Sequence, residues 1–205
     1  MTTDHFAHKA ASYETQKDRV DNVAQIGRSI TDTIALTKSM RIMDFGSGTG
    51  LLLERIAPHV QAITAVDIST SMNGQLRDKK ERVARETACE LEIIEMDLEQ
   101  SILDRKFDGI ISSMTLHHIK NIPALFAKFH SMLNPSGFIA LADLDREDGS
   151  FHSENTGVYH TGFDREIICK QAIDAKFKNV AIATASVVNK AQGTFPVFLL
   201  TGYRD

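Results

Sequence analysis

The sequence contains little cysteine and little proline, and these scarcities exclude several classes of protein. Cys89 and Cys169 lie far apart, without a CxxC pair or the spacing of metal ligands, so the sequence predicts neither a disulfide framework nor a cysteine-based metal site. The four prolines are scattered, and no internal repeat or low-complexity tract marks a linker. This composition favours an ordinary folded domain in a reducing, cytoplasmic setting.

Excess positive charge and long apolar runs are also lacking. The 23 basic and 27 acidic side chains give a formal net charge of -4, which provides no broad positive field and argues against nonspecific nucleic-acid binding. No apolar run reaches the roughly 18 residues of a membrane span, and residues 1–22 lack the apolar core of a signal peptide. The 205 residues suit a single domain, residues 1–205, whose partner is expected to be a small molecule.

Short apolar segments alternate with amphipathic segments along the chain. The apolar segments predict strands at 41–45, 62–66, 91–96, 107–113, 137–142, 179–186 and 195–203. The amphipathic segments predict helices at 17–37, 50–58, 70–87, 122–133 and 164–175. This alternation predicts a doubly wound α/β fold, with a mostly parallel sheet covered on both faces. Only "NKAQGT" separates the last two strands, so they are expected to form a hairpin whose final strand runs antiparallel.

Three glycines at alternate positions mark the turn after the first predicted strand, in the stretch "MDFGSGTG". Small residues at this place let a ligand touch the main chain, and the following helix offers unpaired backbone N–H groups. The dinucleotide fingerprint G-x-G-x-x-G/A does not fit, because its last position, counted from Gly46, falls on Leu51. Asp44, just before the loop, would disfavour a pyrophosphate but could attract a cationic ligand. The loop therefore indicates a ligand without phosphates.

Two further carboxylates follow the next two predicted strands. Asp67 ends the strand in "ITAVDIST", the position from which a carboxylate holds both hydroxyls of a ribose. Asp97 follows the third strand in "IEMDLEQ", where it could accept a hydrogen bond from the exocyclic amine of an adenine. Asp67 by itself could instead be a helix N-cap or a turn residue. Together with the glycine loop, the two acids favour an adenosine that carries positive charge and no phosphate.

The motifs "MDFGSGTG", "AVDIS", "EMDLE" and "FDGIISSMTLHHIKN" resemble, in order and spacing, those of the class I S-adenosylmethionine-dependent methyltransferases. The resemblance is close over residues 40–145 and implies a Rossmann-like, seven-stranded sheet with an antiparallel last strand. It implies S-adenosyl-L-methionine as the cofactor, bound by a core at residues 38–145. The residues that the resemblance assigns to this cofactor are Tyr13, Asp44, Gly46, Ser47, Gly48, Gly50, Asp67, Ile68, Met72, Asp97, Leu98 and Ser113.

The stretch "SSMTLHHIKN" follows the fourth predicted strand and should lie near the donor methyl group. It lacks the N-P-P-Y type of motif by which methyltransferases of amino groups in nucleic acids and glutamine are known. His117 is the candidate to face the cleft, as a general base or by positioning the acceptor. His118 is the candidate for packing or for a backbone contact, since adjacent side chains seldom point the same way. The alternative is that both histidines are structural.

A polar segment at residues 143–163 lies between the fifth predicted strand and the next helix. Loops of this length are usually functional, and this one starts at the carboxyl end of a strand, so it is expected to cover the substrate. Its last acid, Asp164, is expected to cap a helix. A metal site is an alternative, although no H-x-H or H-x-x-x-H spacing occurs. The substrate-side residues predicted here, besides His118, are Asp143, His152, Tyr159 and His160.

The N-terminal segment, residues 1–37, resembles the helical lid that folds over the cofactor in the same family. Phe6, Lys9, Tyr13 and Arg19 stand in the pattern of that lid. Tyr13 is expected to close on the methionine end of the cofactor and to exclude water. The alternative is an ordinary amphipathic packing helix.

The function implied by these observations is methyl transfer from S-adenosylmethionine to the oxygen, sulfur or nitrogen of a small acceptor. A protein that binds S-adenosylmethionine without catalysis is one alternative, because the well-matched residues hold the donor and none of them proves chemistry. Methylation of a macromolecule is a second alternative. A nicotinamide oxidoreductase fits least, given the loop spacing and Asp44.

Overall fold

The computed structural model describes residues 4, 7, 10–152 and 157–205 of the chain. Phe6 and Lys9 of the predicted lid lie outside the described residues, as does the part of the predicted substrate-side loop at 153–156. Among the described residues, no helix has both the length and the apolar character that a membrane crossing requires.

Seven strands form one sheet in the order β3-β2-β1-β4-β5-β7-β6. The strands are β1 (Arg41–Phe45), β2 (Ala62–Asp67), β3 (Glu90–Glu95), β4 (Phe107–Ser113), β5 (Leu133–Leu144), β6 (Lys178–Lys190) and β7 (Gly193–Tyr203). Strands β1 to β5 pair in parallel, whereas β7 is antiparallel to both of its neighbours, β5 and β6. The predicted fold class and the antiparallel last strand are therefore confirmed.

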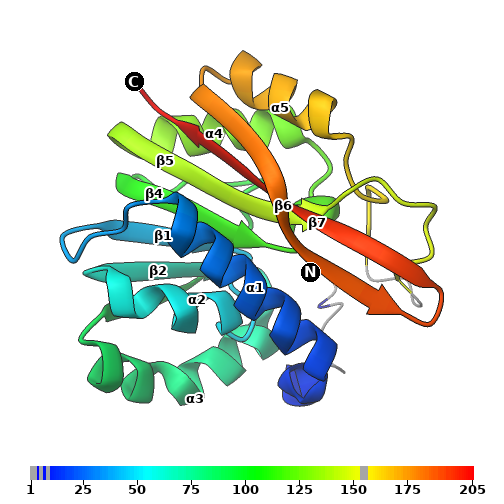
Figure 1. Ribbon diagram of the computed structural model, residues 1–205. Coiled ribbons are helices and arrows are strands. Elements are labelled where there is room, and N and C mark those ends of the chain that lie inside the picture. Colours follow the sequence, from blue (N-terminus) through cyan, green and yellow to red (C-terminus); the bar gives the residue numbers. More distant parts are fainter. Residues whose placement is uncertain (1–3, 5–6, 8–9, 153–156) are drawn as a thin grey trace.

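Helices cover both faces of the sheet (Figure 1). They are η1 (Ala10–Thr15), α1 (Lys17–Thr33), α2 (Leu51–Ile56), η2 (Ala57–His59), α3 (Thr70–Thr87), η3 (Leu116–His118), α4 (Ile122–Met132) and α5 (Arg165–Asp174). Helices α1, α2 and α3 pack on one face, and α4 and α5 pack on the other (Figure 1). The result is the three-layered arrangement that the alternating sequence predicts.

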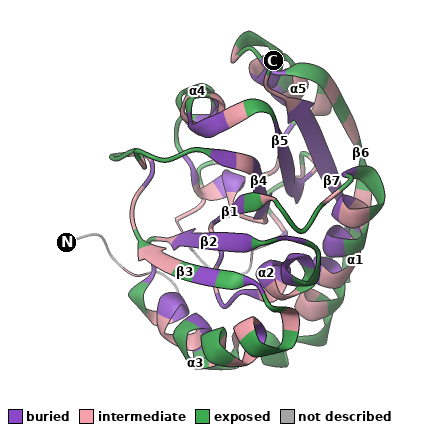
Figure 2. Ribbon diagram, turned by 90° about the vertical axis from the view of Figure 1, so that its left-hand side faces the viewer, coloured by how far each residue is buried: buried purple, intermediate pink, exposed green. Residues whose placement is uncertain are grey.

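The core lies in two apolar layers, one on each face of the sheet. Successive residues of β1 supply them in turn, because strand side chains alternate between faces: Ile42 belongs to the layer under α1 to α3, and Met43 to the layer under α4 and α5. Both side chains are fully buried. Figure 2 shows strands that are mostly buried, between helices whose outer faces are exposed. The sheet is therefore a rigid frame for the turns at its edge.

Side-chain caps fix where three helices begin after their strands. The Ser69 hydroxyl accepts a hydrogen bond from the backbone of α3, and Asn121 does the same at α4, so these helices start at defined residues. Asp164 accepts bonds from the first N–H groups of α5, at 2.9 and 3.1 Å, which confirms the predicted cap. The cap at Ser69 matters most for the site, because it fixes the turn that follows β2.

The turn after β1 is interlocked with the turn after β4. Gly46 has a φ of +67°, and a Cβ at this position would lie 2.2 Å from Oγ1 of Thr115. Only glycine fits this place, since both the backbone conformation and the space exclude a side chain. The chain leaves β4 through another unusual residue, Met114, which has a φ of 57° without being glycine. The two turns therefore hold each other at the carboxyl ends of neighbouring strands.

We predict opposite effects for two glycine-to-alanine substitutions. Gly46→Ala should lower the free energy of unfolding by about 2 to 4 kcal/mol, since it adds a clash with Thr115 to an unfavourable φ. Gly74→Ala, inside α3, should raise it by about 0.5 to 1 kcal/mol, because alanine favours a helix more than glycine does. A Cβ at Gly74 meets no atom of the described residues within 4 Å. Urea unfolding of both variants measures the difference; equal stabilities would contradict the interlock.

Candidate functional site

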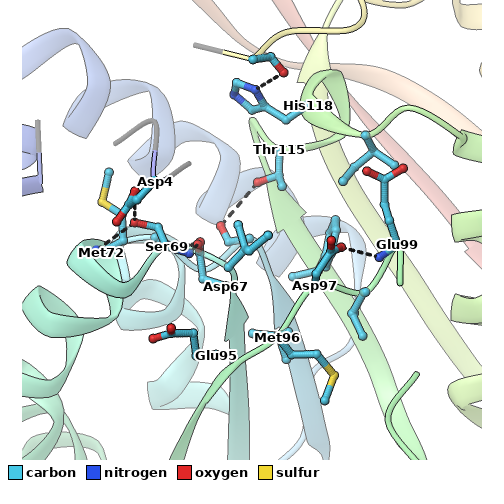
Figure 3. A pocket seen from close by; sticks show the side chains of 18 of the residues that line it. Asp4, Asp67, Ser69, Met72, Glu95, Met96, Asp97, Glu99, Thr115 and His118 are labelled. Carbon is cyan, nitrogen blue, oxygen red and sulfur yellow. Dashed lines mark hydrogen bonds between the residues drawn. The ribbon is translucent and has the colours of Figure 1, made fainter. Parts of the chain in front are cut away.

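A cavity of about 620 Å³ opens at the carboxyl ends of β1, β2, β3 and β4. The last residue of each of these strands lines it: Phe45, Asp67, Glu95 and Ser113. The sheet order reverses between β1 and β4, and ligands of open α/β sheets bind at such a reversal. The volume suits one or two small molecules. This cavity is therefore the candidate site (Figure 3).

Asp67 joins two turns at the centre of the cavity. One carboxylate oxygen accepts a hydrogen bond from the Gly48 N–H, and the other accepts one from the Ser69 N–H, both at 2.8 Å. Burial raises the pKa of Asp67 and outweighs these two hydrogen bonds, which act to lower it; the Asp4 carboxylate raises it further. A carboxylate has more lone pairs than two donors occupy, so Asp67 can still accept hydrogen bonds from a pair of hydroxyls.

Gly48 offers its backbone to the cavity. Its φ is +53°, and a Cβ built there meets no atom of the described residues within 4 Å. Packing therefore explains the glycine at position 46 but not the one at position 48, which lines open space. Such an open stretch of main chain is what a ligand needs if it is to approach the loop closely. Ser47 and Gly50, also predicted to bind the cofactor, do not line the cavity.

Asp44 lies beneath the loop and is fully buried. Burial, reinforced by the nearby Asp67 carboxylate, raises the pKa of Asp44 to about 8. Its Oδ2 has no hydrogen-bond partner among the described residues, and the same holds for the buried hydroxyl oxygens of Ser47, Thr49 and Ser113. Unsatisfied buried polar atoms are rare in folded proteins, and of these four residues only Ser113 lines the cavity. Asp44, which the sequence predicts to bind the cofactor, does not line it.

The other end of the cavity is suited to a flat ring. Ile68, Met72, Asp97 and Leu98 line it, as the sequence predicts. Ile68 is 48% exposed although it is a large apolar residue. Asp97 accepts a hydrogen bond from the Glu99 N–H at 2.8 Å, which fixes the carboxylate at the rim (Figure 3). The apolar side chains and the fixed acceptor at their edge match an adenine.

Two acids and a methionine of this region were not among the predicted site residues: Glu95, Met96 and Glu99. Glu95 is the last residue of β3, so the rule that ligands bind at strand ends could have found it. Glu99 accepts a hydrogen bond from the Lys120 N–H at 3.0 Å, a contact that links the ring end to the segment before α4.

The expectation that His117 faces the cleft is wrong. His117 is only 2% exposed and does not line the cavity, whereas His118 does. The Asp143 carboxylate at the end of β5 holds the His117 ring, with 2.7 Å between Nδ1 and Oδ1. The His118 ring packs against the His117 ring, with 4.2 Å between the ring centres, and reaches the cavity. His118 also makes the backbone contact predicted for it, since its Nδ1 lies 3.3 Å from the Gly157 carbonyl oxygen.

Asp143 and His117 form a buried pair. Burial opposes the charge of Asp143, but the attraction and the hydrogen bond of the His117 ring, together with backbone N–H groups, hold the pKa of Asp143 below its usual value. The Leu144 N–H donates to this carboxylate at 2.7 Å and the His117 N–H at 3.2 Å. The pair therefore anchors η3 to the end of β5 and does not reach the cavity itself.

The substrate-side loop reaches the cavity at one of its predicted residues. Tyr159 lines the cavity and is 60% exposed, whereas Asp143, His152 and His160 do not line it. The backbone N–H groups of Tyr159 and His160 both donate to the His117 carbonyl oxygen, at 2.9 and 3.2 Å. Among the described residues, no three His, Cys, Asp or Glu side chains are grouped so as to hold a metal ion.

The N-terminal segment reaches the cavity beside Asp67, whereas the sequence predicts that Tyr13 closes on the methionine end of the cofactor. Tyr13 lines the cavity. Burial raises the pKa of its hydroxyl; the positive charge of Arg19 lowers this pKa, and the negative charge of Asp67 raises it further. The Arg19 guanidinium lies 3.8 Å from the centre of the Tyr13 ring. Asp4, which the sequence did not indicate, accepts hydrogen bonds from the Ser69 hydroxyl and the Ser71 N–H, at 2.8 and 3.2 Å (Figure 3).

The strand order, the loop after β1 and the cavity together define the class I methyltransferase fold. Among solved structures, the complex of DhpI with S-adenosylhomocysteine has this fold, with a TM-score of 0.74 at 16% identity, over 98% of this chain and 93% of that one. A family model described as a methyltransferase domain matches residues 17–180. The chain therefore belongs to the methyltransferase-domain family, and the cofactor of class I members is S-adenosylmethionine.

Curated relatives agree with this assignment. An uncharacterized methyltransferase of Schizosaccharomyces pombe is 31% identical over 166 residues, which are 75% of this chain and 57% of that protein. A malonyl-[acyl-carrier protein] O-methyltransferase of Laribacter hongkongensis is 30% identical over 147 residues, which are 65% of this chain and 49% of that protein. The chain thus spans about half the length of these relatives.

We predict that Asp44 makes the protein less stable as the pH rises. The folded state keeps the proton on Asp44 up to about pH 8, whereas the unfolded state loses it near the ordinary value of 3.8, so stability falls across that interval. Relative to Asp44→Asn, the wild-type free energy of unfolding should fall by up to about 1.4 kcal/mol per pH unit between pH 5 and 8. Urea unfolding at several pH values measures this, with Asp78→Asn on the exposed side of α3 as the control. Parallel pH curves for wild type and Asp44→Asn would refute the assignment.

Proposed function

We propose that this chain is an S-adenosylmethionine-dependent methyltransferase that acts on a small-molecule acceptor, with residues 1–205 as one domain. The observation that carries the proposal is the position of Asp67. Its carboxylate is held between the open backbone of Gly48 and the start of α3, in a cavity that the apolar side chains of Ile68, Met72 and Leu98 also line.

The residues of the cavity divide between the parts of the donor. Asp67 accepts the ribose hydroxyls, while Ile68, Met72 and Leu98 enclose the adenine and Asp97 accepts from its amine. The glycine loop and the polar groups beneath it, including Asp44 and Ser113, face the methionine part. S-adenosylmethionine supplies an electrophilic methyl group on a sulfonium, and the main task of the protein is to align the acceptor with it.

The remaining segments exclude water and receive the acceptor. Residues 1–37 form the lid, in which Tyr13 covers the ribose end beside Asp67. Contacts outside the cavity support a closed position of the lid. The Lys79 ammonium of α3 donates hydrogen bonds to Glu14 of η1 at 2.5 Å and to Glu54 of α2 at 2.7 Å. Residues 38–145 bind the donor and residues 143–163 contact the acceptor. Two free cysteines suit a reducing compartment, and we assign the chain to the cytoplasm.

Two other functions remain as alternatives with distinct outcomes. A protein that only senses S-adenosylmethionine would bind it and release it unchanged, whereas an enzyme converts it to S-adenosylhomocysteine in the presence of an acceptor. A macromolecular acceptor would be methylated in a protein or nucleic-acid fraction and not in a small-molecule fraction. The similarity to an O-methyltransferase of Laribacter hongkongensis favours the catalytic reading.

The donor assignment predicts the effect of removing the ribose acceptor. Asp67→Ala should weaken binding of S-adenosylmethionine and S-adenosylhomocysteine by about 1 to 3 kcal/mol, the scale for leaving buried hydrogen-bond groups unpaired. Isothermal titration calorimetry measures both ligands, with NAD as the negative control and Asp78→Ala as the control for lost surface charge. An unchanged dissociation constant in a folded Asp67→Ala protein would remove the ribose assignment.

The lid assignment predicts a separate loss. Tyr13→Ala should weaken S-adenosylhomocysteine binding about tenfold or more, because the ring no longer covers the ribose end and water enters. Thr15→Ala changes an exposed residue of the same short helix and should bind as the wild type does. If both variants keep wild-type affinity, η1 is packing structure and no lid.

A further inference from the structure

Lys128 of α4 holds the turn that follows β3, residues 97–101. Its ammonium donates hydrogen bonds to the carbonyl oxygens of Leu98, Glu99 and Ser101, at 2.6, 2.7 and 3.0 Å. An ammonium has three N–H groups, and these three oxygens use all of them. Hydrogen bonds from a charged donor are stronger than those between neutral groups, so one side chain fixes most of the carbonyl groups of the turn.

The helix that carries Lys128 is itself fixed. Phe126 and Phe129, on either side of the lysine in the sequence, are fully buried in the apolar layer under α4 and α5. The Asn121 side chain caps the helix by accepting the Ala124 N–H at 3.0 Å. Lys128 does not line the cavity, so it can affect a bound molecule only through the turn that it holds.

The same turn carries the groups assigned to the adenine. Asp97 and Leu98 line the cavity. The N–H groups of Gln100 and Ser101 donate to the Asp97 carbonyl oxygen at 3.2 and 2.9 Å, which closes the turn, and the Glu99 N–H donates to the Asp97 carboxylate at 2.8 Å (Figure 3). The N–H groups of the turn therefore orient Asp97, while the carbonyl groups that follow it are bound by the lysine.

We propose that Lys128 is a positioning residue for the base of the donor. Its ammonium keeps the turn in the conformation in which the Asp97 carboxylate accepts a hydrogen bond from the exocyclic amine of adenine. Leu98 is only 1% exposed, so its carbonyl oxygen depends on a donor from the protein, and Lys128 provides it. The inference rests on the proposed methyltransferase function and assigns its selectivity for adenine to a helix outside the cavity.

A second contact keeps the turn beside α4 when the lysine is replaced. The Glu99 carboxylate accepts the N–H groups of Lys120 and Asn121, at 3.0 and 3.4 Å, just before the helix begins. The strand that leads into the turn is paired with β2 as far as Glu95. Loss of the Lys128 ammonium should therefore loosen the turn without detaching it.

Two ligands that differ at one group of the base report the position of Asp97. S-adenosylhomocysteine carries the exocyclic amine, whereas S-inosylhomocysteine carries a carbonyl oxygen there and cannot donate to the carboxylate. The wild type should bind the first at least about thirtyfold more tightly. Lys128→Met keeps an unbranched apolar stem without the ammonium, and should reduce this preference to about threefold, mainly by weakening S-adenosylhomocysteine binding.

Two further variants serve as controls in the same calorimetric titrations. Lys128→Arg keeps the charge and several donors, so its preference should stay within about twofold of the wild-type value. Lys38→Met also removes a lysine that bonds a backbone carbonyl, that of Thr87 at 3.1 Å, but this contact lies at the last residue of α3 and Lys38 does not line the cavity. Its preference should equal that of the wild type.

A double-mutant cycle separates positioning from a general loss of stability. If Lys128 acts through Asp97, the Asp97→Ala protein should bind S-adenosylhomocysteine within about threefold of the protein that carries both Asp97→Ala and Lys128→Met. Fully additive losses, or an unchanged preference in Lys128→Met, would overturn the proposal. If Lys128→Met does not fold, Lys128→Gln, which keeps an amide donor group, replaces it with the same readouts.

The wild-type titration is done first and distinguishes two failures. No binding of S-adenosylhomocysteine would refute the donor assignment, and with it the proposed function. Binding of S-adenosylhomocysteine without preference over S-inosylhomocysteine would leave the donor site in place and overturn the role of Lys128 in recognising adenine.

Discussion

The bonds from the Asp67 carboxylate to the N–H groups of Gly48 and Ser69 are the contacts on which the site depends. They join the turn after β1 to the turn after β2, so the two turns are fixed relative to each other at the edge of the sheet. The same contacts bury the Asp67 carboxylate close to two other acids. The charge of Asp4 raises the pKa of Asp67, and the charge of Asp67 raises the pKa of Asp44. The frame therefore holds several acids together, and a ligand with positive charge and hydrogen-bond donors relieves that arrangement.

Much of the fold follows from local patterns in the sequence. The predicted bounds of β4 and α3 coincide with those of the structure, because an apolar run between polar turns and a capped, charged helix leave few alternatives. The predicted strand ends place Asp67 and Ser113 in the cavity, since parallel strands bring their carboxyl ends to one edge. The predicted start of β5 at residue 137 is wrong. The strand begins at Leu133, because Leu133 pairs with Phe107 of β4, a contact between segments that are far apart in the chain.

The sequence could not resolve contacts between residues far apart in the chain. His117 and His118 have the same side chain and adjacent positions, and what distinguishes them is Asp143, 26 residues away. Asp4 reaches Ser69 across 65 residues, and no motif around Asp4 indicates that contact. The two glycines of the loop could not be distinguished from the sequence either. A side chain at position 46 would clash with Thr115, 69 residues away, whereas a Cβ at position 48 would meet no atom of the described residues within 4 Å. The sequence motif indicates that these residues have a role, but the role of each one becomes visible only from its contacts in the folded protein.

The reversed direction of β7 decides on which side of the molecule the described chain ends. Tyr203 pairs with Phe138, near the start of the parallel run of β5, whereas the cavity lies where the parallel strands finish. Figure 1 shows the C-terminus at the end of the sheet where the parallel strands begin, away from the turns that form the site. A linker that joins Asp205 to a surface or to a second protein would therefore leave the cavity mouth facing outward. The topology thus provides an orientation for immobilisation or fusion in which small molecules keep unobstructed access.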